Sequence, residues 1–167
     1  VNAGQSRYYG VELDLLANLT ARDQLSAYVA WSDAEYTDFA TAVGSTNLQL
    51  AGNTPPQAPE WSINLGYEHD FALPTGVLTL RAQSHYETSS YFTVYNYDYD
   101  KQDAYTRSDV IATYRPDAGA WKLEAYVRNL EDETVLAYAQ TASGTYRSYR
   151  YLYQAPRTFG VKVSVDW

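Results

Sequence analysis

The sequence predicts an all-β fold, in which about seven antiparallel strands form a segment of a transmembrane β-barrel. Three observations lead to this expectation. Apolar and polar residues alternate along the chain, short and long connections alternate between the strands, and aromatic residues gather near the strand ends. Alternation with period two indicates strands that have one apolar and one polar face. No stretch has the period of a helix.

The first three predicted strands cover 9–17, 25–31 and 61–67. In the first, "YGVELDLLA", apolar residues occupy every second position, and Leu16 is the one apolar residue out of phase. The second and third, "LSAYVAW" and "WSINLGY", follow the same rule. Each carries a tryptophan where it meets a long connection. We therefore expect all three to be strands with one apolar face.

The other four predicted strands cover 78–86, 109–114, 121–128 and 159–167. Two of them have a flaw, because Ser84 interrupts the apolar phase of one and Ile111 is out of phase in the next. The last strand, "FGVKVSVDW", alternates without exception. Its apolar residues are Phe159, Val161, Val163, Val165 and Trp167.

The connections between the predicted strands are short and long in turn. The short ones contain "TARD", "HDFALPTG" and "RPDAGA", which are rich in turn residues. The long ones run roughly over 33–60, 88–104 and 131–152. Because successive antiparallel strands place successive joins at opposite ends of a sheet, every short turn falls at one end. One trimmed end and one elaborated end is the arrangement of an outer-membrane barrel.

The composition excludes several classes of function. With 12 basic and 20 acidic residues the formal net charge is −8, whereas nucleic-acid binding needs a basic face. The absence of cysteine excludes disulfides and thiolate metal sites. No apolar stretch approaches the ~18 residues of a membrane-spanning helix. The opening segment "VNAGQSRYYG" lacks the regions of a signal peptide, so we expect any export signal to lie upstream.

Aromatic residues on the apolar phase fall into two rows, as expected for girdles at the two membrane interfaces. The row beside the short turns contains Tyr67, Tyr114, Trp121 and Trp167. The row beside the long connections contains Tyr9, Trp31, Trp61 and Tyr86. The last strand would rise about 20 Å when tilted by ~40°, close to the ~25 Å apolar band of such barrels.

A secreted β-sandwich also has alternating strands, so alternation alone leaves that fold open. The polar phase favours a barrel, because its charged residues would be costly to bury in a packed core. These residues are Glu12, Asp14, Arg81, His85, Lys122, Glu124, Arg128 and Lys162. They fit the wall of a wet or plugged lumen. Bacterial barrels have an even number of strands, so we expect seven strands to be one piece of a larger barrel.

Four motifs resemble the C-terminal barrel section of TonB-dependent outer-membrane receptors. They are "GVE" at 10–12, "PPQAPEW" at 55–61, "VRNLED" at 127–132 and "APRTFGVKVSVDW" at 155–167. The likeness runs the length of the chain, and the last two motifs are its more specific part. The chain departs from the family at its final residue, where Trp167 replaces the more frequent phenylalanine.

The resemblance implies an active-uptake receptor in the outer membrane of a Gram-negative bacterium, with a barrel of about 22 strands around an N-terminal plug. Residues 1–167 would be the C-terminal barrel part, without the plug through which TonB supplies energy. The family most often imports ferric siderophores, and otherwise haem, cobalamin or saccharides. Its partners include outer-membrane lipid, lipopolysaccharide and the barrel-assembly machinery. That machinery would recognise the terminal strand from Phe159 to Trp167.

Two long connections carry the candidate ligand contacts. The connection 88–104 is rich in tyrosine, which offers a rigid apolar face and a hydroxyl. Its candidate residues are Tyr91, Tyr95, Tyr97 and Tyr99. Extracellular loops of barrels are also commonly tyrosine-rich without binding a ligand. In 131–152, Arg147 and Arg150 lie among tyrosines and suit an anionic ligand, lipopolysaccharide phosphates or a surface ion pair.

The sequence predicts no enzyme, metal site or cofactor. Asp98, Asp100 and Asp103 lack the glycine and distal glutamate of a calcium loop. Ser84 and His85 point to opposite faces of one strand, which is unsuitable for a nucleophile and its base. We therefore expect a transport receptor segment that binds a ferric siderophore or similar bulky nutrient. The alternative is a non-transporting surface or adhesion module.

Overall fold

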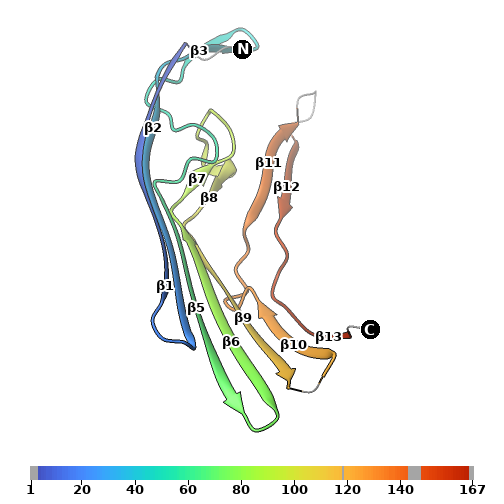
Figure 1. Ribbon diagram of the computed structural model, residues 1–167. Coiled ribbons are helices and arrows are strands. Elements are labelled where there is room, and N and C mark those ends of the chain that lie inside the picture. Colours follow the sequence, from blue (N-terminus) through green and yellow to red (C-terminus); the bar gives the residue numbers. More distant parts are fainter. Residues whose placement is uncertain (1–3, 118, 143–147, 166–167) are drawn as a thin grey trace.

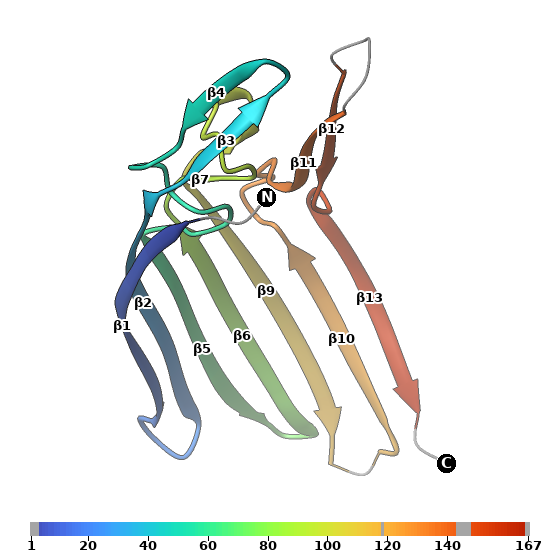
Figure 2. The same cartoon turned by 90° about the horizontal axis from the view of Figure 1, so that it is seen from above.

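The computed structural model describes residues 4–117, 119–142 and 148–165. Within these residues, seven strands form one antiparallel sheet in the order β1-β2-β5-β6-β9-β10-β13. Their bounds are β1 Gln5–Asn18, β2 Asp23–Asp38, β5 Trp61–Leu73, β6 Gly76–Glu87, β9 Tyr105–Pro116, β10 Trp121–Arg128 and β13 Thr158–Val165. Figures 1 and 2 show them side by side as a curved wall. The seven predicted strands and their antiparallel order are therefore confirmed.

The two ends of the sheet differ as predicted. The short joins 19–22 and 74–75, with the described residues of the join after β9 (117 and 119–120), lie at one end, and the described parts of the three long joins lie at the other, as Figure 2 shows. We call these the turn end and the loop end. Each short turn joins two strands that pair directly: β1 with β2, β5 with β6, and β9 with β10.

The long joins contain short strands that the sequence did not predict. Each contains a pair of short strands that lies outside the seven-stranded sheet. The pairs are β3 Ala40–Val43 with β4 Thr46–Gln49, β7 Ser90–Tyr91 with β8 Lys101–Gln102, and β11 Leu136–Ala142 with β12 Ser148–Tyr153. The 3₁₀ helix η1, Asp98–Asp100, lies between β7 and β8. No helix in the described ranges is long and apolar enough to cross a membrane.

Hairpin β3–β4 shows why the sequence did not predict these short strands. Only Gly44 and Ser45 connect its strands, and Gly44 has a φ of 62°, which suits the tight turns of two-residue hairpins. Four-residue strands are too short to show a clear alternation. A short strand with no period therefore reads as a loop.

Pairing across the sheet places the alternating residues on two distinct faces. In one row, Leu65 pairs with Ser84, which pairs with Ser108. We call the face that carries Leu65 the apolar face and the opposite one the polar face. On central strands, Leu65 is 50% exposed and Val110 is 40% exposed, although both strands are paired on each side. In the described part of the chain, no second layer covers the apolar face.

The flaw at Ser84 has a structural explanation. Its hydroxyl lies 3.0 Å from the hydroxyl of Ser108 on the neighbouring strand, and the two form a hydrogen bond. Ser108 donates and Ser84 accepts, so the two hydroxyls are paired on the apolar face, where an unpaired hydroxyl would be costly. Ile111 lies on the polar face between Arg81 and Tyr126.

The most buried apolar side chains lie at the loop end rather than in the middle of the sheet. Phe39, Leu50, Val135 and Ala139 are between 2% and 6% exposed, and all four belong to the long joins. The sheet is thus a wall with two open faces. Among the described residues, the most buried apolar cluster belongs to the joins. Contacts among the joins therefore decide how the loop end is arranged.

Gly76, the first residue of β6, provides a test of the turn between β5 and β6. An added Cβ would lie 2.2 Å from the backbone oxygen of Arg115, a distance that neither strand can relieve without moving. We expect Gly76→Ala to lower the free energy of unfolding of the detergent-folded complete protein by about 2 kcal/mol or more. Urea unfolding followed by tryptophan fluorescence measures this. Gly44→Ala is the control and should cost about 1 kcal/mol, because only its backbone conformation is unfavourable. Equal losses in both variants would contradict the steric argument.

Candidate functional site

A continuous series of tyrosine ring contacts joins two of the long connections at the loop end. The ring centroids are 5.6 Å apart for Tyr95 and Tyr97, and 5.1 Å apart for Tyr97 and Tyr99. The series crosses to the next connection through Tyr99 and Tyr149 at 4.5 Å. It ends with Tyr149 and Tyr151 at 6.4 Å. We call these five residues the tyrosine ladder.

The ladder is held by backbone as well as ring contacts. The hydroxyl of Tyr151 donates a hydrogen bond of 2.9 Å to the backbone oxygen of Tyr99. Gln102 links the same two connections, because its side-chain oxygen accepts the backbone N–H of Leu136 at 2.7 Å. Figure 1 shows hairpin β11–β12 rising at the loop end near β7 and β8. The two connections therefore form one surface, and four of its five rings are 36–42% exposed.

Two asparagines hold the connection between β6 and β9 against the join that precedes β5. Asn96 has a φ of 52°, and its side chain accepts the backbone N–H of Thr54 and donates to the backbone oxygen of Thr54. Asn53 donates to the backbone oxygen of Val94 at 2.9 Å. These bonds hold the turn that precedes Tyr97, so the ladder starts from an anchored segment.

A second polar lock lies at the base of hairpin β11–β12. Asn129 is fully buried, and its amide group bonds to the backbone of Glu133 in both directions and to the backbone oxygen of Ala155. Asp132 accepts the backbone N–H of Arg157 and forms an ion pair of 3.3 Å with its guanidinium group. The sequence motifs "VRNLED" and "APRTFG" therefore meet as one corner. This corner fixes where the hairpin leaves the sheet.

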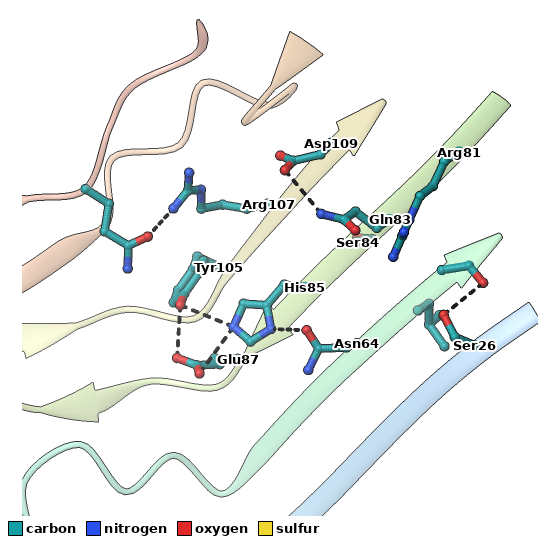
Figure 3. Close-up of a pocket in the computed structure, with 13 residues that line it drawn as sticks. Ser26, Asn64, Arg81, Gln83, Ser84, His85, Glu87, Tyr105, Arg107 and Asp109 are labelled. Atoms are coloured by element: carbon teal, nitrogen blue, oxygen red, sulfur yellow. Dashed lines mark hydrogen bonds and ion pairs between the residues drawn. The ribbon is translucent and has the colours of Figure 1, made fainter. Parts of the chain in front are cut away.

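The loop-end half of the polar face contains a cavity of about 570 Å³. His85 is its centre: one ring nitrogen lies 2.8 Å from the side-chain oxygen of Asn64, and the other lies 3.2 Å from Glu87 and 3.4 Å from Tyr105 (Figure 3). The hydroxyl of Tyr105 also donates to Glu87 at 3.0 Å. Arg107 donates to the side-chain oxygen of Gln154.

The sequence did not place Tyr105 and Arg107 at this cavity, because it predicted that the fifth strand begins at residue 109. It begins at Tyr105. The signal that could have found them is the alternation itself. Continued from Asp109 to every second residue before it, the alternation puts Arg107 and Tyr105 on the polar face beside His85. In the described residues, no group of three or more His, Cys, Asp or Glu side chains could hold a metal ion.

The family of the chain follows from comparison with known proteins. The family model for the TonB dependent receptor-like β-barrel matches residues 1–130. The chain belongs to this family. It is 30% identical over 141 residues to the ferrichrome outer membrane transporter/phage receptor of Escherichia coli (strain K12), a match that covers 82% of the chain and 18% of that protein.

Solved structures agree on the fold. The ferric yersiniabactin uptake receptor of Yersinia pestis matches 99% of the chain and 24% of its own length, with a TM-score of 0.82 and 20% identity. The ferric preacinetobactin receptor of Acinetobacter baumannii matches all of the chain and 23% of its own length, with a TM-score of 0.75 and 24% identity. The chain thus spans less than a quarter of these relatives, and its fold is that of one part of a receptor barrel. These relatives are receptors and a transporter by name.

The predicted ligand contacts have different positions in this receptor segment. Tyr95, Tyr97 and Tyr99 are brought together in the ladder, whereas Tyr91 pairs with Lys101 in β7–β8. Arg150 pairs with Gln140 across the hairpin. Because side chains alternate along a strand, Arg150 points away from the face that carries Tyr149 and Tyr151. Arg147 lies outside the described residues. Ligand contact stays a prediction for all of them.

The predicted aromatic rows are partly in mutual contact. At the loop end, Tyr9 and Trp31 lie 5.7 Å apart, and Trp31 and Trp61 lie 6.5 Å apart. At the turn end, Tyr114 and Trp121 lie 5.8 Å apart. The hydroxyl of Tyr67 bonds to Asp23, and Tyr86 pairs with Ile63. Trp167 lies outside the described residues. The interface role of both rows stays a prediction.

Asp100 is a buried acid beside the ladder. Its carboxyl is 2% exposed, and one oxygen has no hydrogen-bond partner while the other accepts the hydroxyl of Thr93. Burial raises the pKa of Asp100 above its ordinary value, and the Thr93 bond opposes that rise only in part. The folded state therefore favours the protonated carboxyl of Asp100 more than the unfolded chain does. Its contribution to stability is present at acidic pH and is lost as the pH rises through the raised pKa.

This sign leads to a pH-dependent prediction. Asp100→Asn keeps an acceptor for Thr93 but removes the charge, so at neutral pH the backbone amides of 91–102 should exchange hydrogen more slowly than in the unchanged protein. The difference should disappear below the ordinary aspartate pKa of about 4. Hydrogen exchange across this pH range, corrected for intrinsic rates, measures it. Asp98→Asn is an exposed control in the same turn and should have no effect. Slower exchange in both variants would contradict the role of burial.

Proposed function

We propose that the chain is the C-terminal barrel part of an outer-membrane active-uptake receptor, energised through TonB, for a ferric siderophore or a similar bulky nutrient. Membership of the receptor barrel family supports the class. The names of three relatives, which refer to ferrichrome, yersiniabactin and preacinetobactin, support a ferric siderophore as the ligand. The segment would supply barrel wall and extracellular surface, while a plug elsewhere in the protein would engage TonB.

The exposed apolar face supports insertion in the outer membrane of a Gram-negative bacterium. On β13, Val161, Val163 and Val165 are 62–70% exposed, and covering such side chains with lipid is favourable. The aromatic rows would then lie at the two interfaces, with lipopolysaccharide beyond the row at the loop end. The polar face would line the lumen. The alternative of a soluble β-sandwich lacks support, since no second sheet covers the apolar face in the described part of the chain.

The observation that carries the ligand-binding proposal is the tyrosine ladder. It joins two connections at the loop end and leaves four of its five tyrosines 36–42% exposed, so it offers a rigid surface for flat or apolar parts of a chelate. Tyrosine loses little conformational freedom on binding because it has few rotatable bonds. Ladder rings that are already stacked lose even less. The ladder therefore supports a binding surface better than five independent loop tyrosines would.

The ladder can be tested in the complete receptor. Tyr97→Ala combined with Tyr149→Ala removes one ring from each connection, and we expect about tenfold weaker binding of the ferric siderophore that the unchanged receptor takes up. Quenching of tryptophan fluorescence measures affinity, and growth on a panel of ferric siderophores under iron limitation identifies the ligand.

Tyr138→Ala is the matched control. Tyr138 lies on the same hairpin and is 41% exposed, but it does not belong to the ladder. Its substitution should leave affinity within twofold. Equal effects of the control and the double variant, or no effect of either, would count against the ladder as the binding surface.

We further propose that the barrel-assembly machinery recognises β13. Its apolar residues Phe159, Val161, Val163 and Val165 lie on one face of a strand, and Phe159 is 80% exposed. The outer edge of β13 is unpaired in the seven-stranded sheet. A strand with an accessible edge and a regular apolar face suits recognition by strand addition. Trp167 would complete the signal.

Replacing the two aromatic residues of this signal tests it. We expect Phe159→Ala with Trp167→Ala to reduce insertion of the complete receptor severalfold, because the apolar face loses its two largest anchors. The heat-modifiable mobility of the membrane fraction on gels gives the folded share. Leu152→Ala, an exposed leucine on β12, is the control. Normal membrane yield of the double variant would remove the signal role.

A further inference from the structure

The chain contains no cysteine and no methionine, and this determines which of its side chains an oxidant attacks. Sulfur-containing side chains are ordinarily among the first that an oxidant modifies. In their absence the oxidisable side chains are the aromatic ones, and the chain has 18 tyrosines and 4 tryptophans. Trp31, Trp61 and Trp121 belong to the aromatic rows of the sheet, whereas the tyrosine ladder lies on the connections at the loop end. The ladder therefore gathers exposed, oxidisable rings in one place.

One pair in the ladder, Tyr99 with Tyr149, links the two connections. The ring centroids of this pair are 4.5 Å apart, the shortest separation in the ladder, and the ring planes are inclined by 51°. Two rings joined directly by one carbon–carbon bond have a similar separation and are twisted rather than parallel. The other ladder pairs are closer to parallel, and their centroids are 5.1–6.4 Å apart. Tyr99 is 37% exposed and Tyr149 is 42% exposed, so both can meet an oxidant from solution.

Hydrogen bonds beside the pair hold the two rings in this position. The hydroxyl of Tyr151 donates to the backbone oxygen of Tyr99 at 2.9 Å. The side-chain oxygen of Gln102 accepts the backbone N–H of Leu136 at 2.7 Å, which ties the same two connections together shortly after Tyr99. A reaction between two groups is faster when both are already held near the reactive geometry. Radicals formed on these two rings are therefore placed to react with each other.

We propose that Tyr99 and Tyr149 form a covalent dityrosine cross-link when the loop end meets a haem peroxidase and hydrogen peroxide. The oxidised peroxidase removes one electron and one proton from each phenol, which breaks both O–H bonds and leaves two phenoxyl radicals. The radicals couple through a new carbon–carbon bond between ring carbons ortho to the oxygens. Each of these carbons then loses its hydrogen as a proton and each oxygen regains one, so both hydroxyl groups are restored. The peroxide takes up the two electrons and two protons and becomes two molecules of water.

The cross-link is a modification of the loop end and does not rest on the proposed uptake function. It joins hairpin β11–β12 to the segment that carries η1, because Tyr99 lies in η1 and Tyr149 lies in β12. A covalent link between distant residues restricts the freedom of both segments, as a disulfide does. The chain has no cysteine from which a disulfide could form. Tyrosine coupling thus makes permanent a contact that ring packing and hydrogen bonds hold only reversibly.

The first experiment treats the complete receptor in detergent with a haem peroxidase and hydrogen peroxide. The monomer is isolated on a denaturing gel, so that links between molecules are excluded, and its proteolytic peptides are analysed by mass spectrometry. The expected main product joins the peptide of Tyr99 to the peptide of Tyr149, lacks two hydrogen atoms relative to their sum, and has dityrosine fluorescence. Omitting the peroxide should leave both peptides unlinked. A main product between other tyrosines, or modification confined to tryptophans, would overturn the proposal.

The second experiment uses phenylalanine variants, because phenylalanine keeps the ring but has no hydroxyl to oxidise. Tyr99→Phe and Tyr149→Phe should each abolish the linked peptide. Tyr138→Phe is the control, since Tyr138 is 41% exposed on the same hairpin but lies outside the ladder, and it should leave the yield unchanged. Peroxide treatment of the unchanged protein should also slow hydrogen exchange in 91–102 and 148–153, and Tyr149→Phe should remove this effect. Persistence of the linked product in Tyr149→Phe, or its loss in Tyr138→Phe, would contradict the assigned pair.

Discussion

Antiparallel backbone pairing from β1 to β13 is the constraint on which the rest of the structure depends. Once each strand is paired with its neighbour in register, period-two alternation sends every second side chain to the same face of the wall. A slip of one residue between any two strands would place leucines among the charged residues of the polar face. The pairing between Leu65, Ser84 and Ser108 shows the constraint at work, because the polar Ser84 falls opposite another serine on the apolar face.

The same constraint explains where the functional surfaces lie. A wall with two open faces has no interior of its own, so binding chemistry is possible in two places, on the polar face and on the joins at the loop end. The joins bury Phe39, Val135 and Ala139 among themselves and present the tyrosine ladder. The corner at Asn129 and Asp132 connects these two surfaces, because it fixes the hairpin to β9 and to the start of β13.

Much of this arrangement could be predicted from the sequence. Strong alternation in segments such as 159–167 identified all seven strands of the sheet, and turn residues identified the short joins. The short strands within the long joins were missed, since four residues such as Ala40–Val43 carry no usable period. The start of β9 was placed too late, which concealed Arg107. Arg150 was grouped with the tyrosines by nearness in sequence, but strand geometry points it to the other side of the hairpin.

The sequence by itself determined the strands, their order and the two faces, because alternation and turn length are local properties that each segment carries alone. Only the tertiary structure decided which residues from different strands and joins meet. Tyr99 meets Tyr149, Asn129 meets Ala155, and Arg107 lies beside His85 across long separations in the chain. Such contacts depend on pairing register and on the path of each join. Neither the register nor the path of a join can be predicted from the contacting residues alone.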